Sequence, residues 1–287
     1  MNYLSVENIA KAYGERLLFK GLSFGINEGQ KVGFIAKNGT GKTSLLNILA
    51  GFDSPDEGRV VYRKDITTAF LPQEPNLDPN LSIEETIFSS ENESLRIIGR
   101  YEKALKNPDD AEAYQKAFEE MDAAQAWDFE TQDKQVRFKL TLEDLTQQVK
   151  NLSGGQKKRL ALAVMLLKKP DFIILDEPTN HLDLEMIEWL EAYFKKENFT
   201  IFMVTHDRYF LERVCNEIVE LDEGQLYTYK GNYTYYLDKK DARIALEDTN
   251  TEKAKQLFKK ELDWMRRQPK ARTTKSKSRI DDFHEIK

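Results

Sequence analysis

The stretch FIAKNGTGKTS, from Phe34 to Ser44, decides the fold. Gly41, Lys42 and Thr43 match the phosphate-binding pattern G-x-x-x-x-G-K-[ST], whereas Ala36 stands where the pattern has its first glycine. The preceding QKVGFIA is typical of a buried strand, and the following KTSLLNILAG has the apolar spacing of a helix. A strand, a glycine-rich loop and a helix are the setting of such a loop, so the stretch predicts a phosphate site in an α/β protein.

The chemistry of this loop comes from its backbone and from two side chains. N–H groups at the start of the helix attract anions, Lys42 would reach the β- and γ-phosphates, and Thr43 would hold Mg²⁺. Glycine suits positions with positive φ or close to phosphate. We expect Ala36, at the strand exit, to have a negative φ and a methyl group that points away from phosphate. The predicted ATP-binding residues of the loop are Lys37, Asn38, Gly39, Thr40, Gly41, Lys42, Thr43 and Ser44.

A second motif, FIILDEPTNHLD, places two acids after a buried strand. The apolar residues 172–175 are followed by Asp176 and Glu177. Open α/β sheets bind ligands at the carboxyl ends of their strands. Asp176 can hold Mg²⁺ through water, and Glu177 can act as the general base toward an attacking water. An Asp-Glu-Pro turn is ordinary by itself, but its pairing with a phosphate loop favours the catalytic interpretation.

A third motif, LSGGQKKRLALA, opens a helix with a serine and two glycines. Such a helix start attracts anions with no side chains in the way. A plain serine N-cap is the alternative. The position of Ser153, 23 residues before Asp176, favours the functional interpretation.

The remaining elements are predicted from apolar periodicity and turn residues. We expect charged amphipathic helices in a segment that interrupts the sheet, at 93–107 and 109–127. A helix is expected at 154–169 and a long charged helix from about residue 232, broken near Pro269. Strands are expected at 3–9, 30–36, 58–63, 67–73, 171–176, 199–206, 217–224 and 225–231.

Taken together, a phosphate loop followed by LSGGQ and then LDEP resembles the ATP-binding cassette (ABC) ATPases. The resemblance covers residues 1 to about 230. It implies an α/β P-loop NTPase of the ABC ATPase type, in which a mixed sheet core carries an antiparallel β subdomain and a helical insertion at about 82–168. ATP and Mg²⁺ are the cofactors that it implies.

The resemblance also implies roles for residues that would be unremarkable alone. Tyr13 resembles the aromatic residue that stacks on adenine. Gln73 resembles the glutamine that senses Mg²⁺ and the γ-phosphate, which makes Thr43, Gln73 and Asp176 the expected metal site. His206 resembles the histidine that contacts the γ-phosphate and the catalytic water. The catalytic set is then Glu177, His206 and Gln73, and Asp183 closes the D-loop.

In this family the signature motif acts on the nucleotide of a partner domain. The signature residues here are Ser153, Gly154, Gly155 and Gln156. With one loop and one signature, the chain cannot complete a site alone. The resemblance therefore implies a second cassette, either elsewhere in a parent chain or in a second copy.

Three stretches resemble one branch, the ABC-F group, whose members are soluble and carry two cassettes. They are NHLD at 180–183, THDRYFLERV at 205–214 and YKGNYTYYLDKKDAR at 229–243. The C-terminal ELDWMRRQPKARTTKSKSRIDDF resembles the interdomain linker, most closely of the Uup-type subgroup. We therefore expect a first cassette at 1–230, followed by the start of a linker helix at 231–287 that reaches the ribosome and tRNA.

The charge of the chain is unevenly distributed. The net charge is −6, yet residues 251–287 hold 12 Lys/Arg and 6 Asp/Glu. An acidic body with a basic extension suggests a polyanion contact confined to the basic stretch 266–279, although a solvated helix face would have a similar composition. The candidate nucleic-acid contacts are Arg266, Arg267, Lys270, Arg272, Lys275, Lys277 and Arg279.

Composition excludes several classes of protein. No run approaches the roughly 18 apolar residues of a membrane span, and the N-terminus lacks the apolar core of a signal peptide. The single cysteine, Cys215, forms no intramolecular disulfide and is expected to be a small buried apolar residue. We expect a cytoplasmic ATPase without membrane insertion that acts in translation. A DNA-associated ATPase and the ATPase subunit of a membrane transporter are the alternatives, and NHLD and the basic linker argue against the latter.

Overall fold

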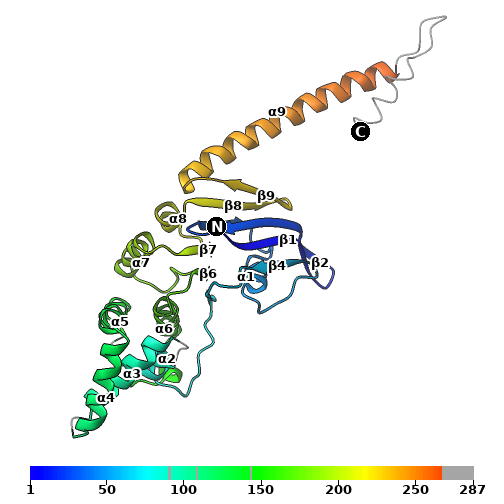
Figure 1. The fold of residues 1–287 in the computed structure, drawn as a ribbon. Coiled ribbons are helices and arrows are strands. Elements are labelled where there is room, and N and C mark those ends of the chain that lie inside the picture. Colours follow the sequence, from blue (N-terminus) through cyan, green and yellow to red (C-terminus); the bar gives the residue numbers. More distant parts are fainter. Residues whose placement is uncertain (90–91, 108, 143, 267–287) are drawn as a thin grey trace, which may run out of the picture. The chain divides into compact units, whose positions relative to one another are not determined.

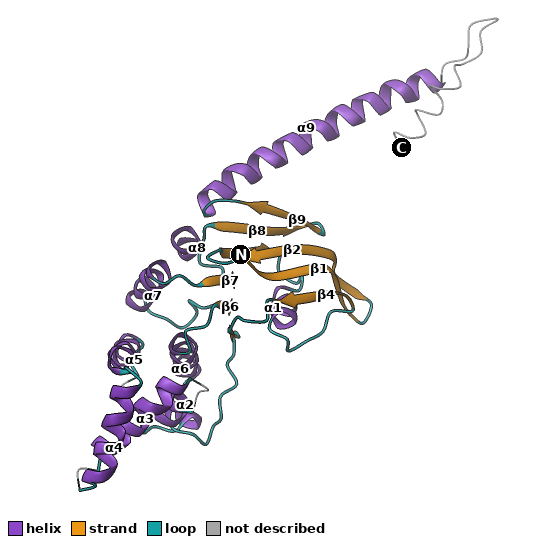
Figure 2. Cartoon of the chain, viewed as in Figure 1, coloured by secondary structure: helices purple, strands orange, loops and turns teal. Residues whose placement is uncertain are grey.

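The computed structural model describes residues 1–89, 92–107, 109–142 and 144–266 (Figure 1). Their contacts divide the chain into one compact unit from Met1 to Tyr233 and a second that begins at Thr234. Within the first unit, the helices between residues 83 and 167 gather in one part (Figure 2).

A six-stranded mixed sheet forms the centre of the first unit. Its order is β5-β6-β7-β3-β8-β9, and every neighbouring pair is parallel except β8 and β9. β6 and β7 are buried along their whole length, as their uninterrupted apolar sequences predict. The strands are β3 (Lys31–Ala36), β5 (Thr68–Leu71), β6 (Phe172–Asp176), β7 (Thr200–Val204), β8 (Glu217–Asp222) and β9 (Gln225–Tyr229).

A second, antiparallel sheet has the order β2-β1-β4. It consists of β1 (Asn2–Tyr13), β2 (Arg16–Asn27) and β4 (Glu57–Tyr62). The register of β1 against β2 shifts at several points, which indicates bulges in this long hairpin.

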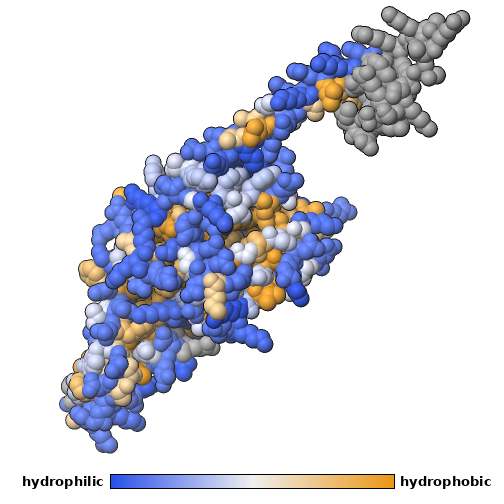
Figure 3. Space-filling model, turned by 45° about the horizontal axis from the view of Figure 1, so that its top comes forward, coloured by the Kyte–Doolittle hydropathy of each residue, from blue (hydrophilic) through white to orange (hydrophobic). Residues whose placement is uncertain are grey.

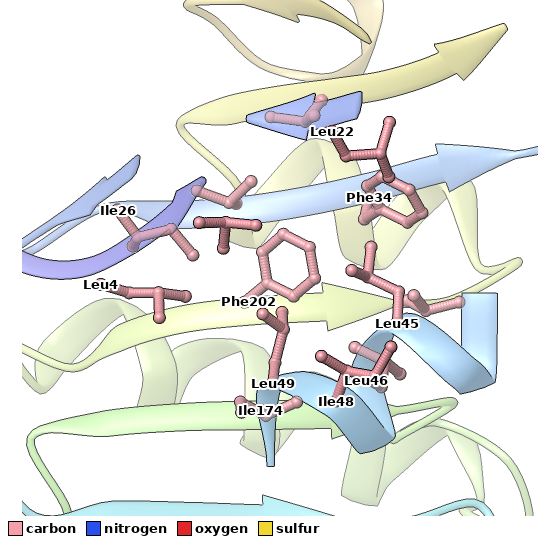
Figure 4. Close-up of a cluster of buried hydrophobic side chains, with 14 of the residues drawn as sticks. Leu4, Leu22, Ile26, Phe34, Leu45, Leu46, Ile48, Leu49, Ile174 and Phe202 are labelled. Carbon is pink, nitrogen blue, oxygen red and sulfur yellow. The ribbon is translucent and has the colours of Figure 1, made fainter. Parts of the chain in front are cut away.

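Helix α1 (Lys42–Leu49) joins the two sheets through one apolar core. Its Leu45, Leu46, Ile48 and Leu49 are buried among side chains of both sheets, including Phe34 of β3 and Phe202 of β7 (Figure 4). Because α1 follows the phosphate loop directly, this packing holds the loop against the central sheet.

The helical insertion has its own apolar cluster, in which Tyr101 packs edge-on against Trp127 at a centroid distance of 5.2 Å. Side-chain caps start four of its helices, at Ser82, Asn92, Asp110 and Ser153. Its helices are α2 (Ile83–Phe88), α3 (Glu93–Leu105), α4 (Ala111–Ala123), α5 (Trp127–Lys139), the 3₁₀ turn η1 (Val149–Asn151) and α6 (Gly154–Leu167). The mixed sheet, the antiparallel sheet and this insertion confirm the predicted fold class.

Two further helices, α7 (Leu184–Lys196) and α8 (Arg208–Val214), follow β6 and β7. Cys215, directly after α8, is a free thiol whose pKa is raised by burial, so it behaves as a small apolar residue as predicted.

The described part of the second unit belongs to the long helix α9 (Tyr233–Arg266). Hydrophilic residues cover most of its length (Figure 3), in keeping with the predicted charged helix. Arg266 is the last described residue, whereas Pro269 and the other candidate nucleic-acid contacts, Arg267, Lys270, Arg272, Lys275, Lys277 and Arg279, lie outside the described residues. Within residues 1–89, 92–107, 109–142 and 144–266, no helix is both long and apolar enough to cross a bilayer.

Candidate nucleotide-binding site

The loop between β3 and α1 has the backbone of an anion-binding turn. Gly39 and Gly41 have φ values of 80° and 91°, and Gly41 caps α1. A Cβ on Gly41 would lie 2.9 Å from Leu18 Cβ, so conformation and space both require glycine. Ala36 is not among the residues with positive φ and packs against the apolar core, which confirms the expected backbone at this position.

The side chain of Lys42 lies back over its own loop. Its ammonium donates hydrogen bonds to Ala36 O and Asn38 Oδ1, both at 3.0 Å. These acceptors are neutral, so a phosphate group would replace them with a stronger, charge-assisted contact. Lys37, by contrast, forms an ion pair with Asp222 at 3.0 Å.

Arg16 was not identified from the sequence, although it contacts the same loop. Its Nη2 donates to Gly39 O at 2.9 Å. Arg16 starts β2 opposite Tyr13 in the β1–β2 hairpin, so this hairpin end lies beside the loop. Tyr13 is 59% exposed, with the Lys11 ammonium 5.7 Å from its ring centre. Its ring is therefore accessible to a flat ligand that also reaches the loop.

Asp176 ends β6 with a buried carboxyl that is only partly satisfied. It is 2% exposed, and its Oδ2 has no hydrogen-bond partner in the described part of the chain. Burial raises its pKa and the neighbouring Glu177 adds to this, whereas Lys158 and a hydrogen bond from Thr43 act in the opposite direction.

An unpaired carboxylate oxygen beside a hydroxyl is the kind of donor set that suits a hard cation such as Mg²⁺. The described residues contain no group of three or more His, Cys, Asp or Glu side chains arranged for a metal. Thr43 and Asp176 thus fit an Mg²⁺ ion that takes its remaining ligands from phosphate and water, as is usual for this ion.

Glu177 and His206, from two neighbouring strand ends, meet at the site. Glu177 Oε2 accepts a hydrogen bond from the His206 backbone N–H at 3.2 Å, and Glu177 Oε1 lies 3.6 Å from His206 Nε2. The Glu177 backbone has the unusual φ of 49°, and its N–H donates to Val204 O at 2.8 Å. The His206 side chain is 70% exposed, so it can face a ligand while Glu177 stays largely buried.

Gln73 emerges at the same edge of the sheet. The parallel register pairs Leu71 of β5 with Leu175 of β6, so Gln73 and Glu177 each lie two residues beyond the last paired residues of these strands. Gln73 is exposed. The pairing of β5 with β6 places it near Asp176 and Glu177.

Lys158 of α6 is a second residue that the sequence reasoning missed. It is 1% exposed, and its ammonium donates to Pro72 O at 2.6 Å, Gln73 O at 3.3 Å and Asp176 O at 2.9 Å. Burial lowers its pKa to about 8. The sequence did contain a signal for this burial. Helical spacing places Lys158 on the same face of α6 as the buried Leu162 and Met165.

The signature residues lie at the start of α6. Ser153 Oγ accepts from the Gln156 N–H, and the Gln156 side chain accepts from the Ser153 N–H, which makes a capping box. A Cβ on Gly154 would meet open space. Asp183 caps α7 by accepting from Met186 N at 2.9 Å. Among the described residues, no hydrogen bond or ion pair joins Ser153, Gly154, Gly155 or Gln156 to the phosphate loop.

The comparisons with known proteins agree with the nucleotide-binding geometry described above. A family model described as ABC transporter matches residues 19–180, and an extension model with the same description matches 219–287. The uncharacterized ABC transporter ATP-binding protein YfmR of Bacillus subtilis (strain 168) is 45% identical over 100% of this chain and 47% of its own length.

Two relatives carry the name energy-dependent translational throttle protein EttA. The protein of Escherichia coli (strain K12) is 38% identical over 95% of this chain and 50% of its own length. That of Mycobacterium tuberculosis (strain ATCC 25618 / H37Rv) is 35% identical over 98% of this chain and 52% of its own length. The chain spans about half the length of the curated relatives that it matches.

Solved structures share the fold. An ATP-binding subunit of an ABC transporter superposes with a TM-score of 0.59 at 23% identity, over 79% of this chain and 90% of that chain. A dimeric post-hydrolysis state of an ATP-binding cassette, bound to ADP and Pi, superposes with a TM-score of 0.55 at 25% identity, over 79% and 98%. The chain therefore belongs to the ABC transporter family, as an ABC ATPase cassette followed by the extension of that family.

Proposed function

We propose that this cassette binds and hydrolyses ATP as part of an ABC-F protein that acts on the ribosome. The observation that carries the nucleotide site is the meeting of three chain segments at the carboxyl ends of β3, β6 and β7, which are neighbours in the sheet. They are the phosphate loop, the pair Asp176 and Glu177, and His206. Such strand ends are where α/β sheets bind ligands.

Binding is assigned to the loop and the hairpin beside it. Adenine stacks on Tyr13, and the loop residues Lys37 to Ser44 surround the phosphates with N–H groups. Lys42 exchanges Ala36 O and Asn38 Oδ1 for the β- and γ-phosphates. Thr43, Gln73 and Asp176 are the residues that would hold Mg²⁺, and the ion would supply positive charge to offset the charge that develops on the phosphate.

Hydrolysis is assigned to Glu177 and His206. Glu177 accepts a proton from the attacking water, and His206 orients the water and the γ-phosphate for in-line displacement. The 3.6 Å separation of Glu177 Oε1 and His206 Nε2 leaves room for both to reach one water molecule.

The second half of each site is assigned to a partner cassette. Ser153, Gly154, Gly155 and Gln156 would close on the γ-phosphate of that partner, with Asp183 at the same interface. The open space around Gly154 and the absence of a described contact between these residues and their own loop support this assignment. The dimeric cassette bound to ADP and Pi is a relative in which two such domains are paired.

The ribosomal role rests on relatives and on charge. EttA, by its name, throttles translation in an energy-dependent way, and its similarity covers nearly all of this chain. The basic stretch 266–279 supplies cations that suit RNA phosphate. A cytoplasmic location follows from this proposal.

The Glu177→Gln variant tests the role directly. The variant should bind ATP without hydrolysing it and thereby hold any ATP-dependent complex together. We expect it to sediment with ribosomes in ATP and not in ADP, whereas the unchanged chain does so weakly. Retention on DNA without ribosomes would replace the ribosomal role with the DNA-associated alternative, and ATP-independent sedimentation would contradict an energy-dependent role.

Charge reversal in the tail serves as the matched comparison. Replacing Arg272, Lys275 and Lys277 with glutamate in the Glu177→Gln chain should weaken sedimentation and flatten its salt dependence, because each lost phosphate contact lowers the salt slope by roughly 1. An unchanged slope would remove the basic stretch from the interface.

A transporter subunit is the remaining alternative, since both the family description and the printed name of YfmR refer to transport. Nucleotide-dependent capture by membrane vesicles, without capture by ribosomes, would favour it.

A further inference from the structure

Lys158 provides a connection between motifs that the proposed roles leave unexplained. An ammonium group has three N–H donors, and here three carbonyl oxygens lie within hydrogen-bond distance, on Pro72, Gln73 and Asp176. The donors are thus fully used by backbone atoms of two other segments. Lys158 itself stands in the second turn of α6, the helix that begins with the signature residues.

The position of these carbonyls is significant, because they lie just beyond the last residues that pair β5 with β6. The last paired residues of β5 and β6 are Leu71 and Leu175. The residue that follows β5 is Pro72, which has no N–H to continue the pairing. Lys158 therefore joins the two chain segments at the point where direct strand pairing stops.

Packing by itself does not account for a lysine at this position. Lys158 lies on the apolar face of α6 with Leu162 and Met165, where an aliphatic side chain would bury as well. A buried ammonium is costly unless its donors are satisfied. In the part of the chain that the structure describes, no carboxylate lies within ion-pair distance of it. Its ammonium is stabilised by the three carbonyls and by the negative charges of the nearby Asp176 and Glu177.

We propose that Lys158 is a positioning residue that couples the signature end of α6 to Gln73 and Asp176. A movement of α6 displaces the Lys158 ammonium and with it the carbonyls of both residues. The link would therefore connect the motif assigned to a partner's nucleotide to the residues assigned to this chain's own Mg²⁺ and γ-phosphate. This inference rests on the proposed roles of Gln73, Asp176 and the signature.

A double-mutant cycle between Lys158 and Gln73 tests the coupling in the full chain. Lys158→Met keeps the aliphatic volume and removes the donors. We expect kcat to fall about tenfold, with ATP affinity in the absence of Mg²⁺ changed less than about twofold, as for a residue that acts only on the organised site. In a Gln73→Ala background the same substitution should cost less than about twofold, because the two residues act as one unit.

A lysine with a merely structural role would behave differently. Its loss would lower kcat by the same factor in both backgrounds and weaken ATP binding with and without Mg²⁺. That additive result, obtained with an unchanged chain that hydrolyses ATP, would overturn the role of Lys158 alone. Failure of the unchanged chain to bind or hydrolyse ATP would instead count against the proposed function.

Controls keep the test decisive. Lys157→Met, at the partly exposed neighbouring lysine, should leave kcat within about twofold. If Lys158→Met folds poorly, Lys158→Gln retains two N–H donors and should give a smaller loss of kcat with the same non-additivity.

Hydrogen exchange on the unchanged chain tests the link without any variant. Amides of residues 71, 73 and 74 and of residues 153–158 should slow together when an ATP analogue and Mg²⁺ bind, and slowing of one segment alone would contradict the link.

Discussion

At the scale of single residues, the two glycine positions of the phosphate loop are under different constraints. Gly41 has a φ of 91° and no room for a Cβ beside Leu18. Ala36 has ordinary strand geometry and contributes its methyl group to the core. The departure from the motif at Ala36 thus falls where a side chain is tolerated.

A pair of reciprocal substitutions tests this difference. Ala36→Gly restores the motif and should leave ATP affinity within about twofold, while it lowers the free energy of unfolding by roughly 0.5–1 kcal/mol through backbone entropy. Gly41→Ala should lower it by roughly 2 kcal/mol or more and abolish ATP binding, because strain and a close contact combine. Chemical denaturation and nucleotide titration measure both, and a large gain in affinity from Ala36→Gly would contradict the account.

A second residue-scale prediction concerns Asp133, which is buried in the helical insertion. Burial raises its pKa to about 6 from 3.8, although Arg137 Nη2 lies 2.5 Å from its Oδ2. The same Arg137 Nη2 also lies 2.7 Å from Oε1 of Glu102 in α3. The negative charges of Glu102 and Glu130 raise the Asp133 pKa further.

The sign of the pH effect follows from this raised pKa. Between about pH 4 and pH 6 the folded protein holds a proton that the unfolded chain has released, so stability falls as pH rises through this window. Relative to Asp133→Asn, which does not titrate, the unfolding free energy should drop by roughly 1–3 kcal/mol across it. Denaturation of both proteins at a series of pH values measures this, and a constant difference would show that Asp133 is ionised throughout.

At the scale of elements, α6 combines a structural and a functional end. Ser153 and Gln156 form a capping box that satisfies the first N–H groups of the helix. The same serine is proposed to contact the nucleotide of a partner. Stability and catalysis can therefore be separated at this position.

Two substitutions at Ser153 separate them. Ser153→Ala removes the cap and should cost about 1 kcal/mol of unfolding free energy. Ser153→Asp keeps a good cap, and its charge favours the helix N-terminus, so stability should be maintained. Its carboxylate would however repel a partner's phosphates, and hydrolysis should fall more than tenfold, by analogy with loss of a transition-state contact. Full hydrolysis by Ser153→Asp would argue that the serine only caps the helix.

At the scale of the whole molecule, the proposed function gives the cassette two incomplete halves of a nucleotide site. The phosphate loop, Asp176, Glu177 and His206 gather at one sheet edge, whereas the signature residues share no described contact with the loop. Hydrolysis by this chain should then depend on the association of two cassettes.

Mixing two inactive variants tests this. Lys42→Met removes the phosphate contact from one copy, and Ser153→Asp disables the signature of the other. In a head-to-tail pair, one site takes Lys42 from the second copy and Ser153 from the first and is intact. An equimolar mixture should recover about a quarter of the unchanged activity, since half of the pairs are mixed and each has one good site. Activity that is linear in concentration, with no recovery on mixing, would show that one copy suffices.

Local sequence patterns predicted most of the elements of the fold and brought forward the candidate site residues. β3, β6 and β7 are short apolar runs, and α1 and α6 have clear helical spacing, so they were predicted near their observed bounds. β2, α2, α5 and α8 were not separately identified. β2 contains Gly21 and Gly25, which interrupt its apolar alternation, and α2 and α8 are short. α5 lacks a distinct apolar face, and its packing against the insertion cluster decides its conformation.

The sequence by itself determined the order of the motifs, the candidate residues for phosphate and a cation, and the long charged helix that follows the last strand. These features depend on residue type and short spacing. Only the tertiary structure decided that Arg16 reaches Gly39 and that Lys158 joins Pro72, Gln73 and Asp176. Those contacts join residues distant in the chain, and their partners are backbone carbonyls, which every residue carries and no sequence pattern distinguishes.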